Sequence, residues 1–364
     1  SNYKADFELF MGLGLEKTSP SKKPLVYPLK TFDMDLDEMT SREIFEDVYA
    51  DFRTHQSTYK DKQLVECFHN SIVNNSHLFK DRVVLEIGCG MGLLSLFCAQ
   101  AGAKHVISVD CSVITQLTEI IVKENNMSDV ITVIRSRIED VKQLPHGIKK
   151  VDIIVSNWMG HSLYLDTIIN AIIFARDKFL QPNGLILPDR AELYCVAAND
   201  GIASSKYSYW HDVYGFDMEP IQRDWSNIAK FHTVPDDKIM TDPVLVHCID
   251  LNTCKLKDTN FNLEFTLVST AGGFINSLVI YFKTYFLDGL YTLDTSPLSR
   301  PTHWAQTVLF IDKTIVVPDK ASLLCNLELI RLRDKQNSVQ FNLAMDYFGY
   351  AQYFFEKKYI LSFY

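Results

Sequence analysis

The sequence has no Cys-x-x-Cys pair, and its 8 cysteines are scattered through the chain. Cysteine and histidine residues do not cluster at metal-ligand spacing, so no structural zinc site is expected, and cysteines within apolar runs indicate a reducing compartment. Apolar runs of membrane-spanning length are lacking, as is the charged-then-apolar pattern of a signal peptide at the start. These absences predict a soluble protein of the cytoplasm or nucleus, with no membrane contact and no metal cofactor.

Positive charge is also in short supply. The 36 lysines and arginines are outnumbered by 45 aspartates and glutamates, which gives a formal net charge of −9. Such a chain offers no general basic face to nucleic acid, and basic peptides are the more suitable partners. Hydrophobic residues make up 47% of the 364 residues, with 23 Phe and 17 Tyr, which is typical of a globular protein with a large core.

The chain divides into four predicted regions with different patterns. Residues 1–40 include the polar, proline-broken stretch KTSPSKKP and are expected to form a tail. Residues 41–80 have a helical pattern and are expected to form a helical lid. In residues 81–188, apolar β-branched runs alternate with helical segments, whereas residues 189–364 contain short strands of period two.

These two patterns predict the fold class. The apolar runs VVLEIG, HVISVD, VITVIR and VDIIVSN, each followed by a helical segment, indicate a parallel sheet covered on both faces. The period-two strands that follow Pro188, about eight in number, indicate an antiparallel barrel or sandwich. We therefore predict an α/β domain followed by a β domain.

An aromatic-rich insert of about residues 204–225 interrupts the second half. An exposed apolar arm of this kind usually contacts a partner protein, and a self-packed Ω-loop is the alternative. Its large apolar residues are Tyr207, Tyr209, Trp210, Tyr214, Phe216 and Met218.

The stretch EIGCGMG follows the first predicted strand and begins a helix. Gly88, Gly90 and Gly92 permit a tight turn and let a ligand approach the backbone closely. Asp110 ends the second strand, where a carboxylate can accept hydrogen bonds from a ribose diol. The pattern predicts an adenosine-containing cofactor, either a dinucleotide or S-adenosylmethionine.

Several motifs together resemble the protein arginine methyltransferases. The similarity extends over about residues 44–347 and is carried by VVLEIGCGMG, AGAKHVISVD, VDIIVSNWMG, LYLDTIINAIIFARDKFLQPNGLILPDRAELY, VYGFDM and SPLSRPTHWAQT. The resemblance implies a Rossmann-like methyltransferase domain followed by an antiparallel β-barrel with an inserted helical dimerisation arm. It also implies S-adenosylmethionine as the methyl donor and a head-to-tail ring dimer, in which the arm of one subunit grips the other's cofactor domain.

The resemblance also implies roles for single residues. Glu86 and the three glycines would surround the amino acid part of the cofactor, Asp110 would take the ribose, and His303 would line the substrate pocket opposite Asp47. The remaining residues expected at the cofactor are His55 in the lid and Ile138 and Glu139 beside the adenine. A hydrogen bond at the edge of the barrel is the alternative role for His303.

The stretch SNWMGHSLYLD departs from the family at the substrate. The family holds the substrate guanidinium between two glutamates nine positions apart, and here those positions are Asn157 and Asp166. A guanidinium is best held by bidentate bonds to carboxylates, so the uncharged Asn157 is a poor grip. Asp166 is one methylene shorter than Glu, which moves its carboxylate back by about 1.5 Å. Core packing is the alternative role for Trp158 and Met159.

The lid departs as well. The family offers an arginine to the cofactor carboxylate and a methionine to its sulfur, and the matching positions here are Leu64 and Thr58. Phe45 replaces the first of the family's two tyrosines. A cofactor carboxylate facing Leu64 would be left unpaired.

We therefore predict a catalytically impaired paralogue. It would act as a regulatory subunit, or prozyme, that forms a heterodimer or heterotetramer with an active arginine methyltransferase and helps to select arginine-rich protein substrates. A weak but active arginine methyltransferase is one alternative, and a methyltransferase for a non-guanidinium group is another.

Overall fold

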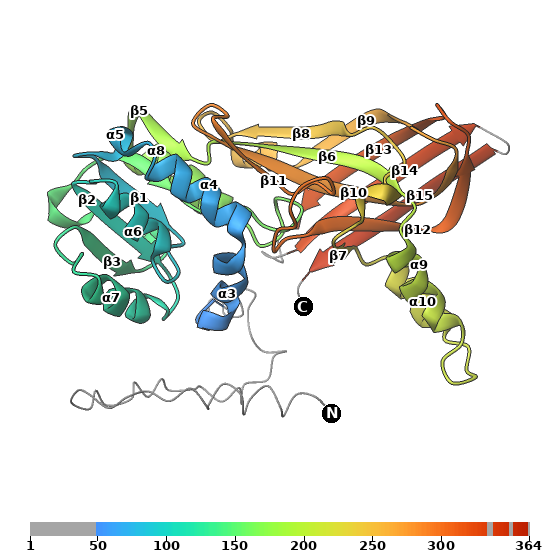
Figure 1. Ribbon diagram of the computed structural model, residues 1–364, viewed down its shortest axis with the longest axis horizontal. Coiled ribbons are helices and arrows are strands. Elements are labelled where there is room, and N and C mark those ends of the chain that lie inside the picture. The colour runs from blue at the N-terminus through green and yellow to red at the C-terminus, as the bar shows by residue number, and fades with distance from the viewer. Residues whose placement is uncertain (1–48, 333–337, 349–351, 363–364) are drawn as a thin grey trace. The chain divides into compact units, whose positions relative to one another are not determined.

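The computed structural model describes residues 49–332, 338–348 and 352–362, all within one unit that extends from Thr40 to the end of the chain (Figure 1). The predicted tail lies outside the described residues, and so do Phe45 and Asp47. The four domain boundaries therefore stay predictions.

Short helices form the first described segment. They are α3 (Phe52–Lys60), α4 (Lys62–Ile72) and α5 (Ser76–Phe79). α3 and α4 are separate because the backbone of Asp61 is extended, with φ −72° and ψ 93°, and interrupts the helical hydrogen bonds. The Asp61 carboxylate caps α4 by accepting a hydrogen bond of 3.1 Å from the Leu64 amide. In the described part of the predicted lid, α3 and α4 are thus joined at one residue, and α5 follows them.

A five-stranded parallel sheet follows, in the order β3-β2-β1-β4-β5. Its strands are β1 (Val83–Ile87), β2 (His105–Asp110), β3 (Ile131–Arg135), β4 (Val151–Val155) and β5 (Leu180–Leu187). The helices between them are α6 (Leu93–Gln100), α7 (Thr115–Glu124) and α8 (Ile169–Phe179), with short 3₁₀ turns η2 (Ile138–Asp140) and η3 (Pro145–Gly147). The predicted parallel sheet is confirmed.

The strand order reverses at β1. The chain adds β2 and β3 on one side of β1 and then returns to place β4 and β5 on the other. Ligands of open α/β sheets bind outside the carboxyl ends of the strands at such a reversal. The glycine loop follows β1 and the Trp-Met-Gly stretch follows β4, so both segments lie at this point.

Helix α8 begins later than the sequence pattern suggests. The apolar periodicity extends back to Asp166, but the first helical residue is Ile169. Asp166 has a positive φ of 66°, which a right-handed helix does not admit. Residues 166–168 therefore belong to the loop and not to the helix.

The second half consists of two antiparallel sheets. The larger has the order β7-β12-β10-β6-β8, with β11 paired to β10, and the smaller has the order β15-β14-β13-β9. The strands are β6 (Arg190–Ala198), β7 (Lys230–His232), β8 (Val244–Asp250), β9 (Phe261–Val268), β10 (Gly273–Phe286), β11 (Tyr291–Asp294), β12 (Gln306–Val317), β13 (Ser322–Arg331), β14 (Ser338–Phe348) and β15 (Gln352–Ser362), with 3₁₀ turns η5 (Asp236–Lys238) and η6 (Leu256–Thr259). All eight predicted strands are present. In this half the prediction missed β7 and β11, which have 3 and 4 residues and are too short to show a period, and in the parallel sheet it missed β5.

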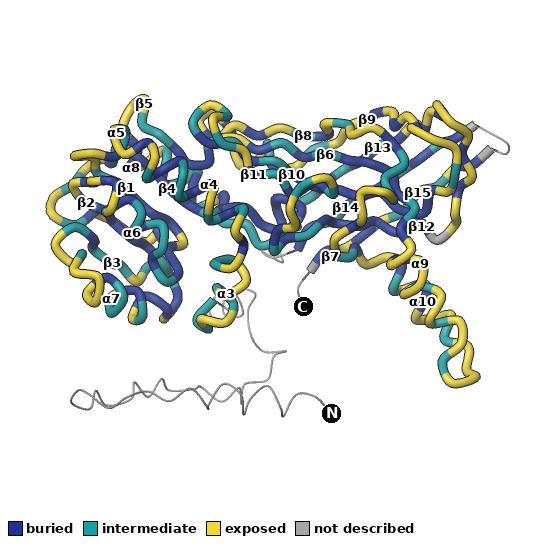
Figure 2. Tube along the Cα trace, in the orientation of Figure 1, coloured by how far each residue is buried: buried dark blue, intermediate teal, exposed yellow. Residues whose placement is uncertain are grey.

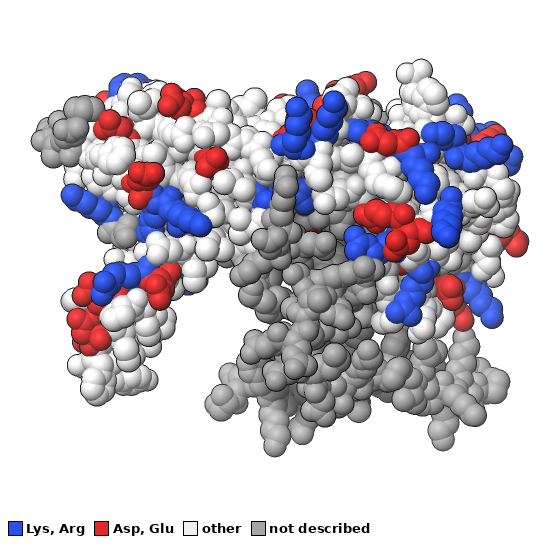
Figure 3. Space-filling view, turned by 180° about the vertical axis from the view of Figure 1, so that it is seen from behind, with Lys and Arg blue, Asp and Glu red and all other residues white. Residues whose placement is uncertain are grey.

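The aromatic insert forms two helices that extend away from the sheets (Figure 1). They are α9 (Gly201–Ser208) and α10 (Glu219–Ser226), with the 3₁₀ turn η4 (Tyr209–His211) after α9. On the side shown in Figure 3, the free end of this arm is white, so no charged residue is visible there. The predicted insert therefore corresponds to residues 201–226.

The parallel sheet and the antiparallel sheets share one hydrophobic core, which runs along the buried segments of Figure 2. A second, smaller cluster lies at the root of the arm and includes Ala203, Tyr281 and Phe310. No helix in the described part of the chain is long and apolar enough to cross a membrane.

Candidate cofactor crevice and substrate loop

The glycine loop after β1 has the backbone that its sequence requires. Gly88, Gly90 and Gly92 have φ values of +71°, +51° and +86°, which L side chains rarely adopt. A Cβ atom at Gly90 would lie 2.9 Å from the ring of His55, so the lid helix α3 lies directly against the loop. The ring of His55 is fixed in turn by a contact of 2.9 Å between its Nε2 and the Tyr49 carbonyl oxygen.

Asp110 lies beside this loop, as its position at the end of β2 predicts. Its Oδ2 accepts a hydrogen bond of 3.0 Å from the Gly90 amide. Its Oδ1 accepts bonds of 2.9 Å from both the amide and the hydroxyl of Ser112. A carboxylate has about four acceptor positions, so three of them are used and one remains for a ribose hydroxyl.

Glu86 lies beneath the loop and not at its surface. It is only 1% exposed, and its carboxyl group accepts a hydrogen bond from the Ser95 hydroxyl, which also contacts Ser108. Burial raises the pKa of Glu86 to about 8, in spite of the opposing effect of Ser95. Glu86 therefore supports β1 and α6 as a buried, protonated group at neutral pH.

The adenine-side residues follow β3 in the turn η2. Ile138 is buried, and half-buried Glu139 lies 3.7 Å from the Nε atom of Arg137. Both residues are at the carboxyl edge of the sheet, on the same side of β1 as Asp110.

The substrate loop after β4 is a tight, buried hairpin. Trp158 is fully buried and donates a hydrogen bond of 3.2 Å to the Pro188 carbonyl, so Trp158 packs in the core. Gly160 allows the turn, because a Cβ atom at this position would lie 1.7 Å from the Leu165 carbonyl oxygen. Met159 is 4% exposed, which agrees with the packing alternative for both residues.

The two grip positions of this loop are in different states. The Asn157 Oδ1 atom is buried and has no hydrogen-bond partner in the described part of the chain. The Asp166 carboxylate accepts a hydrogen bond from the Tyr49 hydroxyl. Burial raises the pKa of Asp166, and the bond from Tyr49 opposes this shift only in part. Sequence reasoning missed this role of Tyr49, for which a helical pattern was the only signal.

Comparisons with known proteins identify the family. One family model, described as the arginine methyltransferase oligomerization subdomain, matches residues 189–348, and another, described as ribosomal protein L11 methyltransferase, matches residues 67–187. Protein arginine N-methyltransferase 1 of Caenorhabditis elegans is 35% identical over 315 residues, which are 86% of this chain and 90% of that protein. The chain belongs to the protein arginine methyltransferase family. The rice protein arginine N-methyltransferase 1 (Oryza sativa subsp. indica) is 38% identical over 283 residues, which are 77% of this chain and 72% of that protein.

Solved structures of arginine methyltransferases have the same fold. The Trypanosoma brucei PRMT1 enzyme–prozyme heterotetrameric complex with AdoHcy matches with a TM-score of 0.82 and 32% identity, over 86% of this chain and 100% of that chain. Arabidopsis thaliana protein arginine methyltransferase 10 matches with a TM-score of 0.78 over 86% of this chain and 99% of that chain. Its identity of 24% makes it a likeness of fold alone.

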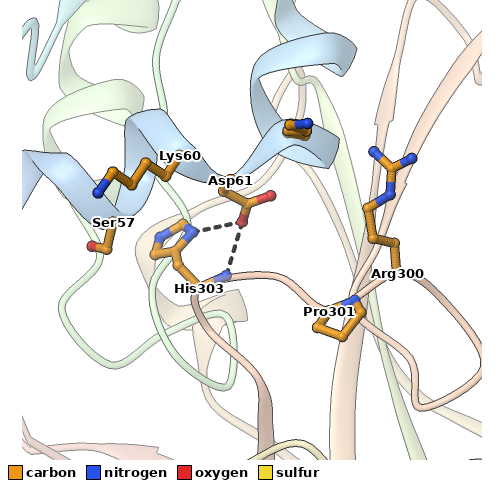
Figure 4. Close-up of a pocket in the computed structure, with 7 residues that line it drawn as sticks. Ser57, Lys60, Asp61, Arg300, Pro301 and His303 are labelled. Carbon is orange, nitrogen blue, oxygen red and sulfur yellow. Dashed lines mark hydrogen bonds and ion pairs between the residues drawn. The ribbon is translucent and has the colours of Figure 1, made fainter.

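The lid positions that depart from the arginine methyltransferase pattern hold uncharged residues. Leu64 is 2% exposed and packs in the main core, and Thr58 is half-buried on α3. Lys60 and Lys62, the nearest cations in sequence, line an open pocket of about 300 Å³ together with Arg300 (Figure 4).

His303 lies in this pocket, and its observed partner is Asp61. Its Nδ1 atom is 2.8 Å from the Asp61 Oδ2 atom, and its amide donates a bond of 2.9 Å to the same oxygen (Figure 4). Burial alone would raise the pKa of Asp61, but the bonds from His303 and from the Leu64 amide together lower it. Asp47 lies outside the described residues, so its position opposite His303 stays a prediction.

The Thr-His-Trp loop also contacts the substrate loop. His161, six residues into SNWMGHSLYLD, has its Nδ1 atom 3.1 Å from the Trp304 carbonyl oxygen. Burial and the nearby His303 lower the pKa of His161 to about 4, so its ring is neutral at physiological pH. The substrate loop, the Thr-His-Trp loop and the lid are therefore joined by direct contacts.

The aromatic residues of the arm are exposed to different degrees. Tyr214 is 93% exposed and Phe216 is 68% exposed at the free end, and Tyr209 also faces outward. Tyr207 instead packs near the root against Trp225 and Phe310. The other two predicted arm residues, Trp210 and Met218, are half-buried, with a hydrogen bond of 3.0 Å from the Met218 amide to the Trp210 carbonyl.

Proposed function

We propose that this chain is a catalytically impaired regulatory subunit, or prozyme, that assembles with an active arginine methyltransferase and stabilises or activates it. The observation that carries this proposal is the pair of grip positions. Asn157 has no charge, and the Asp166 carboxylate is already engaged by Tyr49. Because a charge-assisted hydrogen bond contributes about 1.5–3 kcal/mol, loss of one grip weakens guanidinium binding roughly tenfold to a hundredfold.

The cofactor crevice supports the same proposal. The glycine loop and the remaining acceptor position of Asp110 fit the adenosine part of S-adenosylmethionine, whereas buried Leu64 offers no cation to its carboxylate. S-adenosylmethionine supplies an electrophilic methyl group when it is bound. The residues of this chain would hold the cofactor weakly or not at all, so the active partner would carry out methyl transfer.

The partner is proposed from the arm and the similar structures. Exposed aromatic residues such as Tyr214 and Phe216 need a protein surface to cover them. The Trypanosoma brucei complex is an enzyme–prozyme heterotetramer, which is the kind of assembly that we propose here. The complex would act on arginine-rich proteins in the cytoplasm or nucleus.

The test compares the activity of the chain alone with that of its mixture with an active family member. The purified chain is titrated with S-adenosylmethionine and assayed on a short peptide with one arginine, alone and after mixing with an active family member. We expect little or no turnover by the chain alone and higher turnover by the mixture than by the active member alone. Efficient turnover by the chain alone would favour the alternative of an active enzyme and refute the prozyme.

A restoration experiment probes the grip directly. Asn157→Glu should increase the affinity for an arginine peptide by about tenfold, and Asn157→Gln is the matched uncharged control. Adding Leu64→Arg tests the cofactor position, but Leu64 is 2% exposed and an arginine there is expected to lower stability. Thermal unfolding of the double variant therefore accompanies its S-adenosylmethionine titration.

One observation favours a second candidate function. The buried Oδ1 atom of Asn157 is an acceptor without a donor among the described residues, and a neutral N–H or O–H group on a substrate would satisfy it. A methyltransferase for a non-guanidinium group is therefore the second candidate. Methylation of amide- or hydroxyl-bearing peptides by the chain alone, with none of arginine peptides, would establish it.

A further inference from the structure

The smaller antiparallel sheet has one face in the core and one face open to solvent. Along β13, Leu323, Cys325 and Leu327 are buried, whereas the intervening side chains are not (Figure 2). The same alternation holds on β15 and from Glu264 to Val268 on β9. We call the solvent side the outer face.

One row across the outer face joins all four strands. Leu324 pairs with Thr266 on β9 and with Asp346 on β14, and Asp346 pairs with Phe354 on β15. Leu324 is 52% exposed and Phe354 is 66% exposed, so the row presents two large apolar side chains to solvent. An open groove of about 410 Å³ lies beside this row, lined in part by Thr266, Leu324 and Asp346.

Asp346 lies between the two exposed apolar side chains. Its Oδ1 atom is buried and has no hydrogen-bond partner within the described ranges. A buried acceptor without a donor is unfavourable by about 1–3 kcal/mol, and more when it is charged. A donor from outside the chain would remove this penalty.

The charge of the outer face indicates what kind of donor fits. One ammonium group, that of Lys358, lies on this face. Four carboxylates lie on it as well, and they belong to Glu264, Glu328, Asp346 and Glu356. Glu328 accepts a hydrogen bond of 2.6 Å from Asn342. The carboxylates of Glu264, Asp346 and Glu356 form no ion pair with any described residue. The face is complementary to a cationic partner.

We propose that the outer face docks an arginine-rich segment of the protein substrates of the complex. A guanidinium is planar, so it stacks on an exposed aromatic ring such as Phe354 and bonds to a carboxylate in a bidentate manner. Phe354 lies directly across from Asp346 and two positions from Glu356 on the same face, so one arginine reaches the ring and a carboxylate together. The choice of substrate rests on the proposed function, and the groove and its charges do not.

The test measures binding to the isolated chain. A fluorescently labelled peptide rich in arginine and glycine is titrated with the full chain and followed by anisotropy. Asp346→Asn with Glu356→Gln, and separately Leu324→Ser with Phe354→Ser, should each weaken binding by about tenfold or more. The matched control is Glu119→Gln, an exposed carboxylate on α7, which should leave the affinity within about twofold.

Three further measurements complete the test. A peptide with lysine in place of arginine should bind more weakly, because lysine cannot make the planar contact. Equal binding of the wild type and both double variants overturns the proposal, and so does equal binding of a peptide with glutamine in place of arginine. If the double variants instead lose self-association in sedimentation and keep their peptide affinity, a second copy covers the face and the proposal is wrong.

The assay is independent of the prozyme proposal. Activation of an active family member toward a short one-arginine peptide should be unchanged in both double variants. Failure of the wild-type chain to activate would refute the regulatory role alone, whereas normal activation without peptide binding to the isolated chain would refute the docking surface alone.

Discussion

Replacing Asp200 by alanine should loosen the arm at its root. Asp200 is fully buried, and its Oδ1 atom caps α9 by accepting bonds of 2.9 Å from the Ile202 amide and 3.2 Å from the Ala203 amide. Its Oδ2 atom lies 2.7 Å from the His232 Nε2 atom. Loss of a helix cap costs about 0.5–2 kcal/mol, and loss of a charge-assisted bond about 1.5–3 kcal/mol. We therefore expect the free energy of unfolding to fall by about 2–5 kcal/mol.

Urea unfolding measures this loss, and the partner assay measures its consequence. Asp200→Asn keeps the capping oxygen but replaces the acceptor that faces His232 with an NH₂ group, so it should lie between the wild type and alanine. Asp217→Asn is the control, because Asp217 accepts a similar bond from the Glu219 amide but is exposed. Asp200→Ala should also weaken association with an active family member in sedimentation. Equal midpoints for Asp200→Ala and Asp217→Asn would refute the reasoning.

The stabilisation from Asp200 should also depend on pH. Burial alone would raise the pKa of Asp200, but the bond and charge of His232 and the two amides together lower it. A carboxyl whose folded pKa is lowered stabilises the fold above its unfolded pKa of about 3.9. This contribution is lost as the pH falls below that value through the folded pKa.

Three further predictions concern the crevice and the substrate loop. Burial raises the pKa of Glu86 from 4.5 to about 8, so its contribution to stability falls as the pH rises between these values. Glu86→Gln should therefore reduce the pH dependence of the urea midpoint between pH 5 and 8. An unchanged pH dependence would contradict the shift. Gly160→Ala places a methyl group against the Leu165 carbonyl and should cost about 3 kcal/mol, whereas Gly201→Ala, which meets nothing within 4 Å, should cost nothing in the same unfolding assay. Tyr49→Phe removes the donor to Asp166 and should lower the free energy of unfolding by about 1–3 kcal/mol at pH 7 and by less at pH 4. Equal losses at both pH values would exclude a role for the charged carboxylate.

Most strands were predicted from the sequence because their apolar or alternating patterns are long and regular. β1 and β2 are mostly apolar, β-branched runs, and β13 alternates over most of its length, and both patterns favour strands. The glycine loop and Asp110 were likewise predictable, because a backbone with positive φ requires glycine and the strand ends fix the carboxylate.

Contacts between distant segments were not predictable in the same way. Asp61 lies 242 positions from His303, and Tyr49 lies 117 positions from Asp166. Nothing in the spacing of either pair indicates contact. The departure at Leu64 was visible in the sequence, but its burial in the core was not. That burial changes the restoration experiment, because an arginine at this position affects stability as well as binding.

Asp61 gives the lid and the Thr-His-Trp loop a shared support. One carboxylate holds the first turn of α4 through Leu64 and the loop through two bonds to His303. The energies of these contacts cannot be additive, because removing Asp61 removes them together. A double-mutant cycle between Asp61 and His303 would therefore report a coupling energy, whereas each single substitution would overstate its own contribution. A rotation of α4 would therefore be transmitted to the loop through the Asp61 side chain.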